Sequence, residues 1–306
     1  MKVAITGATG FVGSRLVERL HGEQQEIIAW VRNPEKARQQ FPAAQFPQVT
    51  IVPYTPLEKG SCQERVEGCE AVINLAGEPI ADRWTPQKQK AILESRALGT
   101  QRIVEAINQA ANPPKVLINA SAVGYYGASE TATFVEDNPP GNDFLSKVCQ
   151  DWEAAAQVVT APNCRVVILR TGIVLAYGGA IERMLLPFQL FAGGPIGSGS
   201  QWFSWIHRED LVNAIVYALE QPQVSGVFNA TAPNPVKMAD LCQTLGSVLS
   251  RPSWLPVPEF ALTVLLGDAA QVVLEGQRVI PQRLLSTNFV FQYPDLKPAL
   301  QEFLAH

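Results

Sequence analysis

The chain has 306 residues, of which 47% are hydrophobic, and its 24 Lys plus Arg against 28 Asp plus Glu give a formal net charge of −4. This length supports one large domain or two unequal ones, and the apolar content excludes a disordered chain. The mild negative charge argues against the basic face that general nucleic-acid binding requires, so we expect no nucleic-acid partner.

Short apolar strands alternate with helical patterns over the first 175 residues. The expected strands are residues 2–6, 26–31, 49–52, 71–75, 116–120 and 166–169. The expected helices are residues 11–20, 91–111 and 144–159, with a further helix starting at Pro34 after Asn33. Strands separated by helices require crossover connections and therefore form a parallel sheet. We predict an α/β fold with a doubly wound, parallel, Rossmann-type sheet.

Glycines and prolines interrupt the pattern after residue 175. A strand at residues 204–206, a helix at 210–220 and a strand at 227–229 then follow, and short helices alternate with prolines up to the last residue. We therefore expect residues 1–175 to form a dinucleotide-binding domain to which residues 204–232 return. Residues 176–203 and 233–306 would form a smaller, partly interleaved C-terminal lobe that binds the substrate.

A glycine-rich segment connects the first expected strand to the first expected helix. Gly7 would allow a tight turn, Gly10 would let the backbone approach a pyrophosphate, and Gly13 would let the helix pack closely on the strand. The helix N-terminus adds amide donors for phosphates. The cofactor contacts expected in this segment are Gly7, Thr9, Gly10, Phe11 and Val12. The alternative is a glycine turn with a purely structural role.

The residue at the end of the second strand indicates which dinucleotide binds. An NAD site usually has an Asp or Glu there, which bonds the ribose hydroxyls. Here the strand ends in Arg32, whose guanidinium suits the 2′-phosphate of NADP(H), and Lys36 could add charge. We therefore predict NADP(H) as the cofactor, with a solvated surface Arg32 as the alternative.

The cysteines and the late apolar stretch exclude two further kinds of site. Five Cys are scattered without a CxxC pair and only three His are present, which predicts reduced thiols and no metal site. The apolar stretch of residues 257–274 is broken by Glu259, Gly267 and Asp268, so it predicts a packed helix and no membrane insertion. Without a signal-peptide pattern, we expect a cytoplasmic protein, or an organelle-stroma protein in a plastid-bearing cell.

The motifs TGATGFVG, NLAG at residues 74–77 and SAVGYYG at residues 121–127 resemble those of extended short-chain dehydrogenases/reductases, the NAD-dependent epimerase/dehydratase-like family. NLAGEPIADRW, DFLSKVCQDWE, FSWIHREDL and the tail from residue 257 resemble an atypical subgroup with its own C-terminal domain. That subgroup is described as an epimerase family or as a SulA-like "cell division inhibitor". The resemblance covers nearly the whole chain, and it implies cofactor contacts by Leu75, Ala76, Gly77, Ser121 and Lys147.

The chain departs from the family pattern at the catalytic positions. The family carries Tyr-x-x-x-Lys, in which the Tyr is the acid/base; here Lys147 fits, but the Tyr position reads Asp143. The catalytic Ser would fall on Ala122, one residue after Ser121. An Asp with a reference pKa of about 3.9 would be a poor acid at neutral pH, especially beside Lys147. We favour Asp143 as a helix N-cap over a catalytic role, and an ion pair with Lys147 fits either.

Two other positions depart from the family as well. Arg96 stands where the family has an Asn, and a buried Arg there would clamp a substrate anion unless it pairs with Glu94 or a nearby carboxylate. Phe203 stands where an Arg often holds the pyrophosphate of a nucleotide sugar. The candidate catalytic residues are Lys147, Tyr126, Asp143 and Ser121. The candidate substrate contacts are Glu78, Arg96, Tyr125 and Trp202. Solvated charge is the alternative for Glu78, and packing is the alternative for the aromatic residues.

Two functions fit these observations. The first is an NADP(H)-dependent oxidoreductase or epimerase that acts on an unidentified small molecule with non-standard acid/base groups. The second is a catalytically inactive NADPH-binding sensor or scaffold, linked to cell or plastid division. The family resemblance also raises the expectation of a homodimer.

Overall fold

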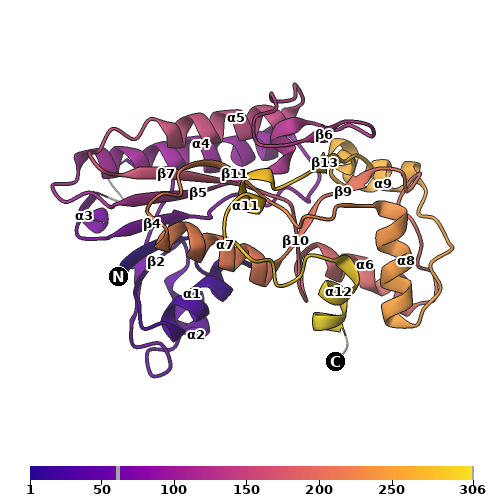
Figure 1. Ribbon diagram of the computed structural model, residues 1–306, viewed down its shortest axis with the longest axis horizontal. Helices are drawn as coiled ribbons and strands as arrows, with labels where there is room; N and C mark the ends of the chain where they lie inside the picture. The colour runs from indigo at the N-terminus through magenta and orange to yellow at the C-terminus, as the bar shows by residue number, and fades with distance from the viewer. Residues whose placement is uncertain (60–62, 305–306) are drawn as a thin grey trace.

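A seven-stranded parallel sheet forms the centre of the computed structural model, which describes residues 1–59 and 63–304 (Figure 1). Its strands, in spatial order, are β11 (Gly226–Ala230), β7 (Arg165–Thr171), β5 (Val116–Ala122), β4 (Ala71–Asn74), β1 (Lys2–Thr6), β2 (Glu26–Val31) and β3 (Val49–Pro53). The chain runs outward from β1 to β3 and then returns to the other side of β1. Ligands bind such sheets where the strand order reverses, at the carboxyl ends of the strands, which here means beside β1 and β4. The predicted α/β fold is confirmed.

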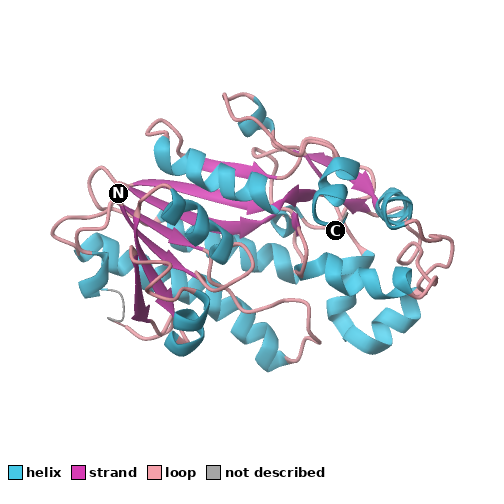
Figure 2. Cartoon of the chain, turned by 90° about the horizontal axis from the view of Figure 1, so that it is seen from below, coloured by secondary structure: helices cyan, strands magenta, loops and turns pink. Residues whose placement is uncertain are grey.

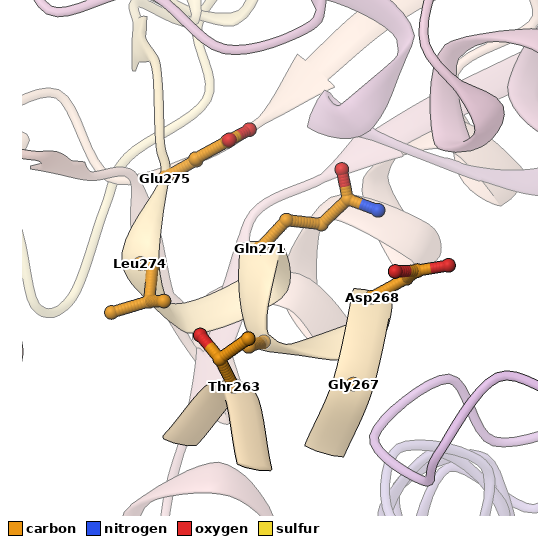
Figure 3. A pocket seen from close by; sticks show the side chains of 7 residues that line it. Thr263, Gly267, Asp268, Gln271, Leu274 and Glu275 are labelled. Carbon is orange, nitrogen blue, oxygen red and sulfur yellow. The ribbon is translucent and has the colours of Figure 1, made fainter. Parts of the chain in front are cut away.

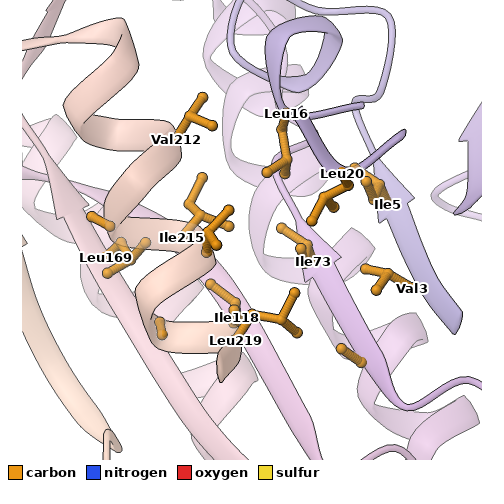
Figure 4. Close-up of a cluster of buried hydrophobic side chains, with 14 of the residues drawn as sticks. Val3, Ile5, Leu16, Leu20, Ile73, Ile118, Leu169, Val212, Ile215 and Leu219 are labelled. Atoms are coloured by element: carbon orange, nitrogen blue, oxygen red, sulfur yellow. The ribbon is translucent and has the colours of Figure 1, made fainter. Parts of the chain in front are cut away.

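Helices cover both faces of the sheet (Figure 2). The helices α1 (Gly13–Gly22) and α7 (Arg208–Glu220) pack on one face, where their aliphatic side chains meet those of alternate strand residues (Figure 4). The other face is covered by α4 (Pro86–Gln109) and α5 (Phe144–Gln157). Because successive strand residues point to opposite faces, Ile118 faces α1 and α7, whereas Leu117 faces α4 and α5.

The helix starts differ from the predicted ones where local chemistry decides the boundary. The first helix begins at Gly13 and not at residue 11, because the preceding residues form the glycine-rich turn. The long helix α4 begins at Pro86, five residues before the predicted start, because the Thr85 side chain accepts a hydrogen bond from the Lys88 backbone N–H. The helix α2 (Pro34–Gln40) starts as predicted, after the cap Asn33.

A smaller lobe lies beyond the carboxyl ends of the sheet, at the right of Figure 1. Its helices are α6 (Gly179–Gln189), α8 (Met238–Leu249), α9 (Glu259–Leu266), α10 (Gln271–Leu274) and α12 (Leu296–Leu304), with α11 (Gln282–Leu285) returning to the sheet. Three two-stranded pairs join distant segments: β8 (Ile173–Leu175) with β10 (Trp205–His207), β9 (Trp202–Phe203) with β12 (Val236–Lys237), and β6 (Thr133–Phe134) with β13 (Arg278–Val279). The remaining elements are α3 (Gln63–Val66) and the 3-10 helices η1 (Val123–Tyr126) and η2 (Gly267–Ala270).

The late apolar stretch does not form the single packed helix that we predicted. Gly267, with φ of +59°, separates α9 from η2, and α9 leaves Phe260, Val264 and Leu265 about 70% exposed. Packing begins at the end of α9: Leu266, Ala269 and Val272 contribute to a core with α4 and α5. Among the helices of the described residues, none is both long and apolar enough to cross a bilayer.

Candidate functional site

Two positions of the glycine-rich segment between β1 and α1, Gly7 and Gly13, leave no room for a side chain. Gly7 has φ of +69°, and a Cβ on it would lie 3.0 Å from the Leu75 carbonyl. A Cβ on Gly13 would lie 2.1 Å from the Gly7 oxygen. Val12 gives α1 no side-chain cap, and its first turn carries no acidic residue. Because no side-chain cap or acidic side chain occupies this N-terminus, it suits the phosphates of a dinucleotide, and the cradle fits the predicted cofactor.

A buried hydrogen-bond network fixes the loop after β4 to the end of β1. The Thr6 hydroxyl donates to Asn74 Oδ1 over 2.6 Å and accepts the backbone N–H groups of Leu75 and Ala76 at 3.2 Å. Asn74 Nδ2 in turn donates to Thr100 Oγ1 at 2.8 Å and Asn119 Oδ1 at 2.7 Å. Thr6 and Asn74 belong to the TGATGFVG and NLAG motifs, but sequence reasoning assigned no role to them or to their partners Thr100 and Asn119.

Arg32 lies at the carboxyl end of the sheet, as predicted, and 72% of its side chain is exposed. Its Nη1 is 3.8 Å from Glu78 Oε2, and Glu78 Oε1 accepts a 2.8 Å hydrogen bond from Lys88. Lys88 also contacts Asp82 at 3.1 Å. The structure thus brings the predicted cofactor residue Arg32 and the predicted substrate residue Glu78 together. Phe11, in the glycine-rich loop, places its ring against Gly178 and Gly179 at the start of α6.

Arg96 lies on α4 beside the loop after β4. Its Nη1 donates to the backbone oxygens of Glu78 at 2.9 Å and Ile92 at 3.2 Å, and its Cζ lies 5.1 Å from the Trp152 ring centroid. Burial lowers the pKa of Arg96. It does not pair with Glu94.

Ser121 belongs to a buried ion-pair network at the end of β5. Its hydroxyl donates to Glu153 Oε1 over 2.7 Å. Arg170 donates to both carboxylate oxygens of Glu153, each at 2.8 Å, and the two side chains are only 4% and 5% exposed. A bidentate pair without solvent holds its partners rigidly. Sequence reasoning assigned no role to Glu153, although it ends the DFLSKVCQDWE motif, or to Arg170, which no quoted motif contains.

Both predicted tyrosines lie against this same arginine. Tyr126 is buried, donates to Asn229 Oδ1 at 2.7 Å and accepts from Arg170 Nη1 at 3.0 Å. Burial raises its pKa, while the Arg170 charge acts in the opposite direction. The Tyr125 ring centroid is 3.3 Å from the Arg170 Cζ, a cation–π contact. Both rings thus pack around Arg170.

Asp143 caps α5, which is the role that we favoured. Its Oδ1 accepts the Ser146 backbone N–H at 2.8 Å, and its backbone has the extended conformation typical of an N-cap. Lys147 pairs with Asp151 at 2.7 Å, not with Asp143, and its side chain is 66% exposed.

Trp202 lies in the C-terminal lobe, apart from the glycine-rich loop. Its indole N–H donates to the Glu130 carbonyl at 2.9 Å, and the ring lies 4.0 Å from Lys237 Nζ and 5.2 Å from the Arg278 Cζ. These contacts join β9, β12 and β13.

A depression of about 320 Å³ lies on the same lobe (Figure 3). It is lined by Thr263, Gly267, Asp268, Ala270, Gln271, Leu274 and Glu275. None of the predicted site residues lines it. Residues 1–59 and 63–304 hold no group of three His, Cys, Asp or Glu side chains that could bind a metal ion.

Comparison with known proteins identifies the family. A profile described as "NAD dependent epimerase/dehydratase family" matches residues 3–230, and one described as "Domain of unknown function (DUF1731)" matches residues 257–303. The Arabidopsis thaliana protein "Epimerase family protein SDR39U1 homolog, chloroplastic" is 50% identical over 307 residues, covering 99% of this chain and 87% of that protein. "Epimerase family protein YfhF" of Bacillus subtilis is 39% identical, covering 100% of this chain and 98% of that protein.

A solved structure agrees with these relatives. The crystal structure of human epimerase family protein SDR39U1 (isoform2) with NADPH has a TM-score of 0.89 and 37% identity, covering 100% of this chain and 99% of that chain. Fold, sequence and motifs therefore point the same way. The chain belongs to the NAD-dependent epimerase/dehydratase family of extended short-chain dehydrogenases/reductases, and it carries a DUF1731 domain over residues 257–303.

Proposed function

We propose that this protein binds NADP(H) at the carboxyl ends of β1, β2 and β4 and acts as an oxidoreductase or epimerase on an unidentified small molecule. The observation that carries the proposal is the glycine cradle of Gly7 and Gly13 with the exposed cation of Arg32 beside it. The similar human protein SDR39U1 was crystallised with NADPH, which supports the same cofactor here.

Each predicted cofactor residue has a distinct role in this proposal. The backbone of the loop that contains Thr9, Gly10, Phe11 and Val12 would hold the diphosphate through the α1 N-terminus. Arg32 would bind the 2′-phosphate by a charge-assisted pair. The backbone from Leu75 to Gly77 would line the nucleoside, and Ser121 and Lys147 would lie toward the nicotinamide ribose. When bound, the nicotinamide supplies or accepts a hydride.

The acid/base step would use a non-standard group. Lys147 is accessible enough to leave Asp151 and hold a ribose hydroxyl. Asp143 could accept a proton at Oδ2, because its cap hydrogen bond from the Ser146 backbone N–H occupies Oδ1. Tyr126 could act only by breaking its buried bonds to Arg170 and Asn229.

A second candidate function is a catalytically inactive NADPH-binding sensor or scaffold, linked to cell or plastid division. It is favoured by one observation: all four candidate catalytic side chains, Lys147, Tyr126, Asp143 and Ser121, already have partners within the protein. Binding would then persist without the standard chemistry. With either function, we expect the protein to work in the cytoplasm or in an organelle stroma. Light scattering tests the expected homodimer.

Mass spectrometry of small molecules released from freshly purified, denatured protein tests the cofactor. We expect near-stoichiometric NADP(H), and a co-released metabolite would identify the substrate. NAD(H) alone, or no nucleotide even after incubation with NADPH, would contradict the proposal. Once a substrate is known, Lys147→Ala separates the two functions: it abolishes turnover in an enzyme, whereas a sensor has no turnover to lose.

A further inference from the structure

The guanidinium of Arg96 is covered on its face and open on one edge. A Cβ on Gly77 would lie 3.0 Å from both Cζ and Nη2 of Arg96 and 3.3 Å from Nε. Because Cζ is as near as the nitrogens, Gly77 covers the flat face of the guanidinium and not its edge. The indole of Trp152 also contacts the guanidinium, with its ring centroid 5.1 Å from Cζ. The absence of a side chain at Gly77 is therefore what makes room for this cation.

The hydrogen bonds of Arg96 involve only one of its three nitrogens. Both acceptors are backbone oxygens, those of Glu78 and Ile92, and both accept from Nη1. Within residues 1–59 and 63–304, Nε and Nη2 have no acceptor. These two nitrogens form the fork that binds a carboxylate or phosphate through two parallel hydrogen bonds.

No ion pair neutralises this charge within residues 1–59 and 63–304, although the charge of Glu78 favours the charged form of Arg96 from a distance. The Glu78 carboxylate is directed to Lys88 and Arg32, and no carboxylate of the described residues lies within ion-pair distance of Arg96. The nearby thiol of Cys149 is not a counter-ion, because burial raises its pKa to about 12. A largely buried cation without a counter-ion is costly, and such a cost is tolerated where an anion binds.

We propose that the open Nε–Nη2 edge of Arg96 binds an oxyanion of the substrate, so that the substrate carries a carboxylate or a phosphate group. The inference rests on the proposed function, because Gly77 follows β4 at the edge where the cofactor would bind. Ser95 fixes this loop by accepting the Glu78 backbone N–H at 3.0 Å, so the fork is held in position before the anion arrives.

The test is a titration of the full-length protein with acetate, malonate and inorganic phosphate, at constant ionic strength set with chloride. Intrinsic tryptophan fluorescence and thermal stabilisation report binding, both with and without saturating NADPH. Variants are Arg96→Gln, which removes the charge, and Arg96→Lys, which keeps the charge but lacks the fork. Arg102→Gln is the matched control, since Arg102 lies on the same helix but pairs with Glu105.

We expect saturable binding of at least one of these anions to the wild-type protein and to Arg102→Gln. Both Arg96 variants should raise the dissociation constant of the bound anion at least tenfold, with NADPH affinity unchanged. If Arg96→Gln does not fold, Arg96→Lys provides the test by itself. A carboxylate preference or a phosphate preference identifies the substrate group.

Wild-type protein that binds NADPH but none of the anions would overturn this inference alone. A tenfold loss of NADPH affinity in Arg96→Lys would also overturn it, because Arg96 would then serve the cofactor diphosphate. Failure of NADPH binding in the wild type would instead contradict the proposed function.

Discussion

The ion pair between Arg32 and Glu78 crosses the place where a dinucleotide would enter. Arg32 follows β2 and Glu78 follows β4, and β1 lies between these strands, so the pair reaches over the glycine-rich loop. Glu78 therefore competes with a 2′-phosphate for Arg32. We expect Glu78→Gln to tighten NADPH binding about two- to fivefold, the range that an exposed pair worth up to about 1 kcal/mol allows. Calorimetric titration with NADPH and NADH measures this effect.

The control for this experiment is Asp82→Asn, which removes a carboxylate that contacts Lys88 but not Arg32. Its NADPH affinity should not change. In an Arg32→Ala background, which we expect to weaken NADPH and not NADH, the gain from Glu78→Gln should disappear. A gain that persists there would mean that Glu78 acts by general repulsion of anions.

The buried pair of Arg170 and Glu153 makes a second prediction for single residues. Glu153→Gln would leave the Arg170 charge without a counter-ion in a site that is about 4% exposed. We expect the free energy of unfolding to fall by about 3–5 kcal/mol, the cost of breaking a buried pair by removing one partner. Urea unfolding measures it. The double variant Glu153→Met with Arg170→Met should lose less than Glu153→Gln alone; an equal or greater loss would contradict this explanation.

At the residue scale, the sequence predicted what a local motif encodes and missed what the fold assembles. The glycine spacing and the Asn33 cap act within a few residues of each other, so they could be recognised directly. The partner of Ser121 is 32 residues away, and that of Thr6 is 68 residues away. Such pairs depend on strand register and helix packing, which a single sequence does not define. Arg96 was recognised because it replaces a family residue, yet the space for its guanidinium depends on the missing side chain of Gly77.

At the scale of elements, the start of α5 decides between two roles of Asp143. The cap needs an oxygen acceptor, whereas an acid/base needs an ionisable carboxyl. Asp143→Asn keeps the acceptor and removes the ionisation, and Asp143→Ala removes both. We expect Asp143→Asn to keep wild-type stability and NADPH affinity, and Asp143→Ala to lose about 0.5–2 kcal/mol of unfolding free energy. Loss of turnover in Asp143→Asn at unchanged stability would show that Asp143 is catalytic.

Strands were easier to predict than helix boundaries for a physical reason. The inner strands of the central sheet, such as β1 and β4, are buried on both faces, so they appear in the sequence as short, continuous apolar runs. Helix α4 starts at a Thr–Pro cap upstream of its apolar stripe, and the tail around α9 is apolar without being packed. Hydrophobicity alone thus does not distinguish a covered helix from an exposed one.

At the scale of the whole molecule, His207 joins the sheet domain to the C-terminal helix α12. It is 1% exposed and lies at the start of α7, where its Nδ1 accepts the Glu209 backbone N–H at 3.2 Å. That bond requires a neutral ring with the proton on Nε2, which then donates to Glu302 Oε2 of α12 at 3.2 Å. Protonation of Nδ1 would remove the cap of α7, so the folded state resists it.

This arrangement predicts a loss of stability at mildly acidic pH. Burial lowers the pKa of His207, while Glu302 and Asp210 act in the opposite direction. Because the pKa is lower in the folded state than in the unfolded state, the unfolded state takes up the proton first as the pH falls below about 6.5. The contribution of neutral His207 to the free energy of unfolding is complete above that pH. It declines below it, by at most about 1.4 kcal/mol per pH unit, until the pH passes the pKa of His207 in the folded state.

Urea unfolding at pH 8, 6.5 and 5.5 measures this decline. His207→Asn supplies a cap that does not titrate, so its unfolding free energy should depend less on pH over this range. If His207→Asn follows the same slope as the wild type, the acid sensitivity arises from other groups, and not from the buried carboxyl of Asp210. Its pKa is raised by burial, so between its unfolded and folded pKa values acid would stabilise the fold, in the direction opposite to His207.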